Sequence, residues 1–185
     1  MQEINISAAS GGDFNEPNFT ESMCELLEEE GFFTDYYIVS YKKHSQGIKV
    51  DAWAYEFEIG TLNLVVSIFS ESDTVETLSK TDLDKAFKRV EKFFQKSLNV
   101  KFHQDLDESD PAYPLSELIY DYKDDINKIK FTVITNYKLS KRVESISKIE
   151  FLNYNSQRDI WDIERVFRGT AISVDPIKID FENKP

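Results

Sequence analysis

One acidic side chain, Asp51, lies near the start of an apolar stretch that reads GIKVDAWAYEFEIGTLNLVVSIFS at residues 47–70. Hydrolysis of a phosphodiester with the help of Mg²⁺ or Mn²⁺ needs several oxygen ligands around the ion and a lysine that assists the attacking water. Asp51 can supply one of those ligands. The second part of the stretch, residues 62–69, reads LNLVVSIF and holds neither a second carboxylate nor a lysine. Ser67 is the only polar side chain at the place where they are needed.

Side chains from other parts of the chain can complete such a site around Asp51. An acid on the preceding helix would be Glu21, Glu25 or Glu28. Lys49 shares the predicted strand face of Asp51 but lies toward the start of that strand. Under this interpretation the catalytic candidates are Asp51, Glu21 and Glu25, the metal ligand is Asp51, and the cofactor is Mg²⁺ or Mn²⁺. Under two alternatives no cofactor is expected, because Asp51 either hydrogen-bonds locally or pairs with a lysine or arginine and serves only the fold.

A second candidate is the basic face of a predicted helix that spans residues 81–98 and begins with Thr81 as its cap. The basic side chains of this face are Lys85, Lys88, Arg89, Lys92 and Lys96. These side chains can bind along the phosphate backbone of a nucleic acid. One of the lysines can also supply the cation that is missing from the strand at residues 62–69. Two other interpretations explain the same face: the solvation of an ordinary surface helix, and an acidic partner such as the protein's own loop at 104–110. Asp84 and Glu91 interrupt the basic run.

The bulk composition favours one globular domain in the cytoplasm. The chain has 185 residues, 41% of them apolar, which is enough for a single core. Its only cysteine, Cys24, excludes a disulfide framework and a thiolate metal site, and His44 and His103 have no second ligand at a suitable spacing. No apolar run reaches the roughly 20 residues of a membrane span, and the first residues lack the order of a signal peptide. A net charge of −12 disfavours binding to nucleic acid except through a local basic patch.

The hydrophobic pattern predicts an α/β (α+β) domain with a mixed β-sheet flanked by helices. Strands are expected at residues 36–41, 50–58, 62–69, 129–136 and 146–154, helices within 14–33, 81–98, 114–127 and 157–168, and an extended segment at 171–181. The strand at 62–69 is apolar almost throughout, as expected of a central strand that is buried on both faces.

Local signals define two further details of these elements. Asp13 or Asn15 can cap the first helix, and Gly31 is expected to end it. Along the strand at 50–58, strict alternation predicts that Asp51, Trp53 and Tyr55 share one face.

The order of these elements resembles that of the restriction-endonuclease-like, PD-(D/E)XK fold, in which a hairpin carries an Asp and then a carboxylate-x-Lys pair. The strings VDAWAYEFEIGTLNLVVSIFS, FFQKSL, VITN, WDIERVF and IKIDF, in this order, are similar to the N-terminal part of AIPR-type proteins. Those are bacterial abortive-infection phage-resistance proteins. The resemblance covers residues 19–181, and it implies that 1–185 is a single domain with a degenerate nuclease core, at the N-terminal part of a longer chain.

The function that this resemblance implies is a non-catalytic N-terminal domain of a phage-defence protein that serves assembly or recognition. Its partner would be the remainder of the full-length protein or a second subunit; nucleic acid is not the favoured partner, and no membrane contact is expected. Two alternatives stay open at this point. One is a divergent metal-dependent nuclease, and the other is a protein-interaction domain unrelated to defence.

Overall fold

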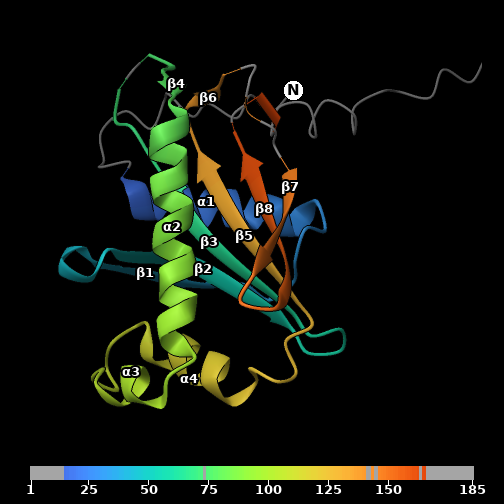
Figure 1. Ribbon diagram of the computed structural model, residues 1–185. Coiled ribbons are helices and arrows are strands. Elements are labelled where there is room, and N and C mark those ends of the chain that lie inside the picture. Colours follow the sequence, from blue (N-terminus) through green and yellow to red (C-terminus); the bar gives the residue numbers. More distant parts are fainter. Residues whose placement is uncertain (1–14, 73, 141–142, 144–145, 163, 166–185) are drawn as a thin grey trace, which may run out of the picture.

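A mixed sheet of six strands forms the centre of the molecule, and helices pack on both of its faces (Figure 1). The computed structural model describes residues 15–72, 74–140, 143, 146–162 and 164–165. The strands lie in the order β1-β2-β3-β5-β8-β7, with the bounds Tyr37–Lys43, Ile48–Glu56, Thr61–Ile68, Lys128–Thr135, Tyr154–Trp161 and Ile146–Phe151. The predicted α/β class with a mixed sheet is therefore confirmed.

The direction of strand pairing changes in the middle of the sheet. β1, β2 and β3 pair antiparallel, β3, β5 and β8 pair parallel, and β7 returns antiparallel to β8. Two short strands, β4 (Thr77–Leu78) and β6 (Lys138–Leu139), form a separate parallel pair. In β3 every side chain from Thr61 to Ser67 is buried, so the prediction of a central strand covered on both faces is confirmed.

One long helix covers each face of the sheet. Figure 1 shows α2 (Lys80–Ser97) in front of the sheet and α1 (Glu16–Glu29) behind it. The core under α2 includes Val66, Phe87, Phe94 and Phe131, and the smaller core under α1 includes Leu27, Phe33, Val65 and Ile134. Adjacent residues of β3 thus point into opposite layers, as the pleat requires. The remaining helices are short: η1 (His44–Gln46), α3 (Val100–Gln104) and α4 (Tyr113–Asp121).

The helix ends agree with the predicted capping at α1 and differ from it at α2. The side chain of Asn15 accepts a hydrogen bond from the backbone N–H three residues on, at 3.2 Å, and Gly31 leaves the helix with a φ of +70°. The cap of α2 is Ser79, whose hydroxyl accepts the N–H three residues on at 3.1 Å, so the predicted cap Thr81 is wrong. Ser79 has the extended backbone that a cap needs, whereas Thr81 is already helical.

The helix predicted at 114–127 is shorter than expected. α4 ends at Asp121, after which the chain turns back toward the hairpin between β2 and β3. There the N–H of Asn127 donates a hydrogen bond to the carbonyl of Gly60 at 2.8 Å. This contact between distant segments sets the start of β5, and it takes the residues after Asp121 out of the helix.

The segment predicted as a helix at 157–168 is a strand over its first part, so that prediction is wrong. β8 runs to Trp161 and pairs with β5 on one side and with β7 on the other. Leu152 and Asn153, with φ values of +49° and +69°, close the tight hairpin from β7. Pairing along both edges outweighs the helical spacing of the apolar residues. Residues 166–168 and the predicted extended segment at 171–181 lie outside the described residues.

The side chains of β2 do not alternate as predicted. Trp53 and Tyr55 pack in the core layer under α2. Asp51 lies on the α1 side, where its charge raises the pKa of the buried Cys24 in addition to the effect of burial. The predicted common face of Asp51, Trp53 and Tyr55 is therefore wrong. At this level two residues of β1, including Ser40 with its φ of +47°, oppose the single residue Asp51, and the pairing of β2 with β3 stops at Ala52, so the ladder is irregular on both sides of Asp51.

Candidate functional site

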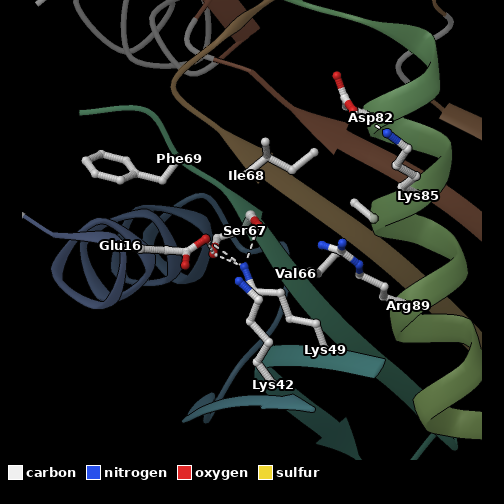
Figure 2. Close-up of a pocket in the computed structure, with 11 residues that line it drawn as sticks. Glu16, Lys42, Lys49, Val66, Ser67, Ile68, Phe69, Asp82, Lys85 and Arg89 are labelled. Carbon is white, nitrogen blue, oxygen red and sulfur yellow. Dashed lines mark hydrogen bonds and ion pairs between the residues drawn. The ribbon is translucent and has the colours of Figure 1, made fainter. Parts of the chain in front are cut away.

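Four polar side chains from three elements meet at the end of β3. Lys49 and Asp51 come from β2, Ser67 from β3 and Glu16 from the first turn of α1. The Nζ atom of Lys49 lies 2.6 Å from Oε1 of Glu16 and 3.1 Å from Oδ2 of Asp51. It also lies 2.8 Å from the carbonyl oxygen and 3.2 Å from the hydroxyl of Ser67. Figure 2 shows Glu16, Lys49 and Ser67 pointing toward one another, and we call the four residues the Lys49 cluster.

The cluster forms where the pairing of β2 with β3 stops. The last residues paired between the two strands are Ala52 and Val65. Beyond them, Oδ2 of Asp51 accepts a hydrogen bond from the backbone N–H of Ser67 at 2.7 Å. If the two strands stayed paired here, this N–H would donate to a backbone carbonyl of β2 instead. The Ser67 hydroxyl lies 3.0 Å from Asp51 Oδ2 and 3.0 Å from Glu16 Oε1, and its single hydrogen serves one of them at a time.

Burial and charge act in opposite directions on the two carboxylates. Lys49 and Asp51 are each only 4% exposed, whereas Glu16 is partly open to solvent. Burial raises the pKa of Asp51 above its ordinary value, although the Lys49 charge and the Ser67 N–H oppose the shift. Burial also acts to raise the pKa of Glu16, but its contacts with Lys49 and Ser67 outweigh that effect and lower it. Lys49 is thus the counterion that holds two neighbouring carboxylates together.

The acid that α1 contributes is not one of the three predicted. Glu21 and Glu25 are exposed and make no contact with Asp51, while Glu28 accepts the backbone N–H of Asp35 at 2.9 Å. The acid at the cluster is Glu16, which sequence reasoning missed. A signal was present, because Glu16 continues the buried stripe of Phe19, Met23 and Leu27 by one turn toward the helix start.

The basic face of α2 lies apart from Asp51. Within the described residues, Asp51 pairs with Lys49 and with none of the α2 cations. The five α2 cations differ in surroundings: Lys85 pairs with Asp82 at 3.0 Å, Lys88 and Lys92 are exposed, Arg89 is half-buried, and Lys96 lies 5.8 Å from the ring centre of Phe102.

The acids that were expected to interrupt this basic face point elsewhere. Glu91 and Asp84 turn toward Arg158 of β8, at 2.7 and 3.9 Å, so they lie on the side of α2 that faces the sheet. Within the described part of the chain, no ion pair joins the basic face to the loop at 104–110.

The residues around Asp51 do not fit a divalent metal ion as they are arranged. Mg²⁺ takes about six oxygen ligands at roughly 2.0–2.1 Å in octahedral geometry. Here the oxygens of Glu16, Asp51 and Ser67 surround the ammonium of Lys49. Across the described ranges, no group of three or more His, Cys, Asp or Glu side chains is placed to hold a metal ion. In the described arrangement the Lys49 ammonium occupies the space between these oxygens.

A pocket of about 280 Å³ lies beside the cluster, between the starts of α1 and α2 (Figure 2). Its lining residues are Glu16, Lys42, Lys49, Val66, Ser67, Ile68, Phe69, Asp82, Lys85, Ala86 and Arg89. Two of the predicted basic residues, Lys85 and Arg89, thus line this pocket. Lys42, from β1, lines it as well and was not among the predicted residues.

Comparison with known proteins connects this domain to one family. The sequence matches the family described as the abortive infection phage resistance protein N-terminal domain, over residues 19–168. Searches of curated proteins and of solved structures returned no match. Among the residues described, no helix has both the length and the apolar character to cross a membrane. Because the family match extends over most of its length, the chain belongs to the family of abortive infection phage resistance protein N-terminal domains.

Proposed function

We propose that this chain is a non-catalytic domain of a phage-defence protein, in which a restriction-endonuclease-like sheet serves recognition or assembly instead of hydrolysis. The family match supports the connection to phage defence. The partner in assembly would be the remainder of a longer protein or a second subunit. The arrangement of the Lys49 cluster supports the absence of catalysis.

The observation that carries this proposal is the position of the Lys49 ammonium. It lies 2.6 Å from Glu16 and 3.1 Å from Asp51, which under this proposal are the carboxylates that would otherwise face a divalent ion. An ammonium group can donate a hydrogen bond to water, but it is not a Lewis acid, so it cannot coordinate a water molecule and lower its pKa as a metal ion does. Lys49 balances the charge of the carboxylates without supplying the chemistry of a metal.

Ser67 supports the same interpretation from the neighbouring strand. It lies on β3 near the place where a nuclease would carry its second carboxylate, and its hydroxyl is neutral. Its N–H and hydroxyl hold the Asp51 carboxylate at 2.7 and 3.0 Å, and its carbonyl holds Lys49 at 2.8 Å. Glu16 contacts both Lys49 and Ser67, so the cluster joins α1 to β2 and β3. This is a structural role.

The test is a cleavage assay with labelled single- and double-stranded DNA and RNA, in the presence of Mg²⁺ or Mn²⁺. We expect no cleavage by the native protein, and no Mn²⁺ at the Lys49 cluster in soaked crystals. Asp51→Asn is the diagnostic variant, and Asp107→Asn, an exposed acid on a distant loop, is its control. Metal-dependent cleavage that Asp51→Asn abolishes and Asp107→Asn preserves would establish a divergent nuclease and overturn the proposal.

A further inference from the structure

The pocket beside the Lys49 cluster has a positive wall. Its floor is the end of β3, and the first turns of α2 form one side (Figure 2). Figure 2 shows Arg89 directing its guanidinium from α2 toward β3, and Lys42 reaching the pocket from below. The two cations therefore come from different elements and approach the same space from different directions.

Among the described residues, neither of these two cations forms an ion pair of its own, although the charge of Lys42 helps to lower the pKa of the nearby Glu16 carboxyl. Lys49 pairs with both Glu16 and Asp51, which leaves one negative charge in the cluster to offset Lys42. Lys85 pairs with Asp82 at 3.0 Å, so Arg89 is the cation of the described pocket lining whose charge is left over. Within the described part of the chain, Lys42 and Arg89 take part in no ion pair. An unbalanced guanidinium in a half-buried pocket wall attracts an anion even though the whole chain has a net charge of −12.

The form of the pocket selects the kind of anion. Arginine presents a planar fork of N–H donors that matches phosphate, and a lysine at another angle can reach a further oxygen of the same tetrahedral group. The remaining lining includes the apolar side chains of Ile68, Phe69 and Ala86. A volume of about 280 Å³ leaves room for an organic group next to the phosphate, and apolar walls with a few polar groups are typical of such sites.

We propose that this pocket binds the phosphate group of a nucleotide, with Arg89 and Lys42 as its direct contacts. The inference rests on the proposed recognition role and gives that role a ligand chemistry. The nucleotide is either free or part of a nucleic-acid strand. In a strand, the neighbouring phosphates would follow the exposed cations Lys88 and Lys92 along α2, which lie one helical turn apart.

The test is a binding titration of the native protein at low salt with four probes: inorganic phosphate, a nucleoside monophosphate, a short 5′-phosphorylated oligonucleotide and acetate. We expect the phosphate probes to bind and acetate to bind far more weakly. Arg89→Gln and Lys42→Gln should each weaken binding of every phosphate probe by about tenfold, because each removes a charge-assisted hydrogen bond. Lys42 is exposed, so Lys42→Gln keeps the test valid if Arg89→Gln is destabilised.

Two matched variants separate the pocket from its surroundings. Lys43→Gln removes the same charge from the next residue of β1, outside the pocket lining, and should change affinity less than twofold. Lys88→Gln should weaken binding only of the oligonucleotide if the ligand is a strand, and of no probe if the ligand is a free nucleotide. An equal loss with Lys43→Gln and Lys42→Gln, or no binding of any phosphate probe at millimolar concentration, would overturn the proposal.

The outcomes also separate this inference from the proposed function. Metal-dependent cleavage by a protein whose pocket binds phosphate as predicted would refute the non-catalytic role and leave the pocket assignment in place. Absence of both cleavage and phosphate binding would refute the pocket assignment and leave the non-catalytic role in place.

Discussion

The Lys49 ammonium lies 3.1 Å from the Asp51 carboxylate, and both residues are almost completely buried, only two positions apart on β2. The period of a strand places such residues on one face, so the pair forms from local geometry. Glu16 and Ser67 then complete the surroundings of Lys49 from α1 and β3.

Replacement of Lys49 by methionine should strongly destabilise the protein. Lys49→Met keeps most of the side-chain volume but leaves the buried Asp51 carboxylate without its cation, a change that costs about 3–5 kcal/mol of unfolding free energy. Urea denaturation measures the loss, and Lys43→Met, at an exposed position on β1, is the control. Combining Lys49→Met with Asp51→Asn should recover part of the loss, and a double variant no more stable than Lys49→Met would contradict this explanation.

A smaller replacement should convert the cluster into a site for a divalent cation. Lys49→Ala leaves the oxygens of Glu16, Asp51 and Ser67 around an unoccupied space with two negative charges. Millimolar Ca²⁺ or Mn²⁺ should then raise the melting temperature of this variant by about 3–5 °C and leave that of the native protein unchanged. Addition of Asp51→Asn to the variant should abolish the response, and a response that survives this addition would show that the ion binds elsewhere.

The lowered pKa of Glu16 predicts how stability depends on acidity. Burial opposes the shift, but Lys49 and Ser67 hold the pKa of folded Glu16 below its ordinary value of 4.5. The unfolded chain therefore takes up the proton at a higher pH than the folded protein, so the contribution of Glu16 is complete above pH 4.5 and disappears as the pH falls through the folded pKa.

Glu16→Gln should flatten this part of the stability profile, as measured by urea denaturation at a series of acidic pH values. Glu25→Gln removes an exposed acid of the same helix that does not contact Lys49, and it should keep the native profile. Identical profiles for Glu16→Gln and the native protein would mean that the Glu16 contact does not persist in solution.

Cys24 should be almost inert while α1 stays in place. Burial, with smaller contributions from Asp51 and Glu28, raises the pKa of its thiol to about 12. At pH 8 the thiolate fraction is then about a thousandfold lower than for an unfolded cysteine with a pKa of about 8.5. Alkylation followed by mass spectrometry should show slow labelling in buffer and fast labelling in urea. Fast labelling in buffer would show that α1 leaves the sheet frequently.

The hairpin between β7 and β8 offers a stabilising change. Leu152 has a φ of +49°, a conformation that costs an ordinary residue about 1 kcal/mol and that asparagine adopts more readily. Leu152→Asn should therefore raise the unfolding free energy by about 0.5–1 kcal/mol in thermal or urea denaturation. Leu152→Ala removes the same exposed apolar side chain but keeps the strain. An equal gain from both variants would mean that φ is not the cause.

Local signals in the sequence were sufficient to predict the ends of α1 and the central strand β3. Asn15 and Gly31 bound α1 as predicted, because caps act on the nearest backbone groups. β3 was recognised because an apolar run of its length suits a strand that is covered on both faces. The sequence also predicted that Lys49 and Asp51 share a face, because residues two positions apart on a strand point the same way.

The failures share a dependence on distant contacts. β8 carries apolar residues at helical spacing, and only its pairing with β5 and β7 makes it a strand. Glu16 was missed because its place in the cluster depends on the contact between the first turn of α1 and the end of β3. Lys42 enters the pocket from a strand whose course is set by a register shift with β2. The pairing of β8 and the position of Lys42 leave no periodic trace in the sequence, whereas Glu16 left only the weak one of a helical stripe.

The Lys49 ammonium also changes how the domain responds to its surroundings. A metal centre of equivalent charge would be filled according to mass action, so its fold would weaken whenever chelators or competing ligands lowered the free ion. A cation that is covalently part of the chain has a fixed stoichiometry of one and cannot dissociate. The junction of α1 with β2 and β3 should therefore keep its shape whatever the concentration of free magnesium.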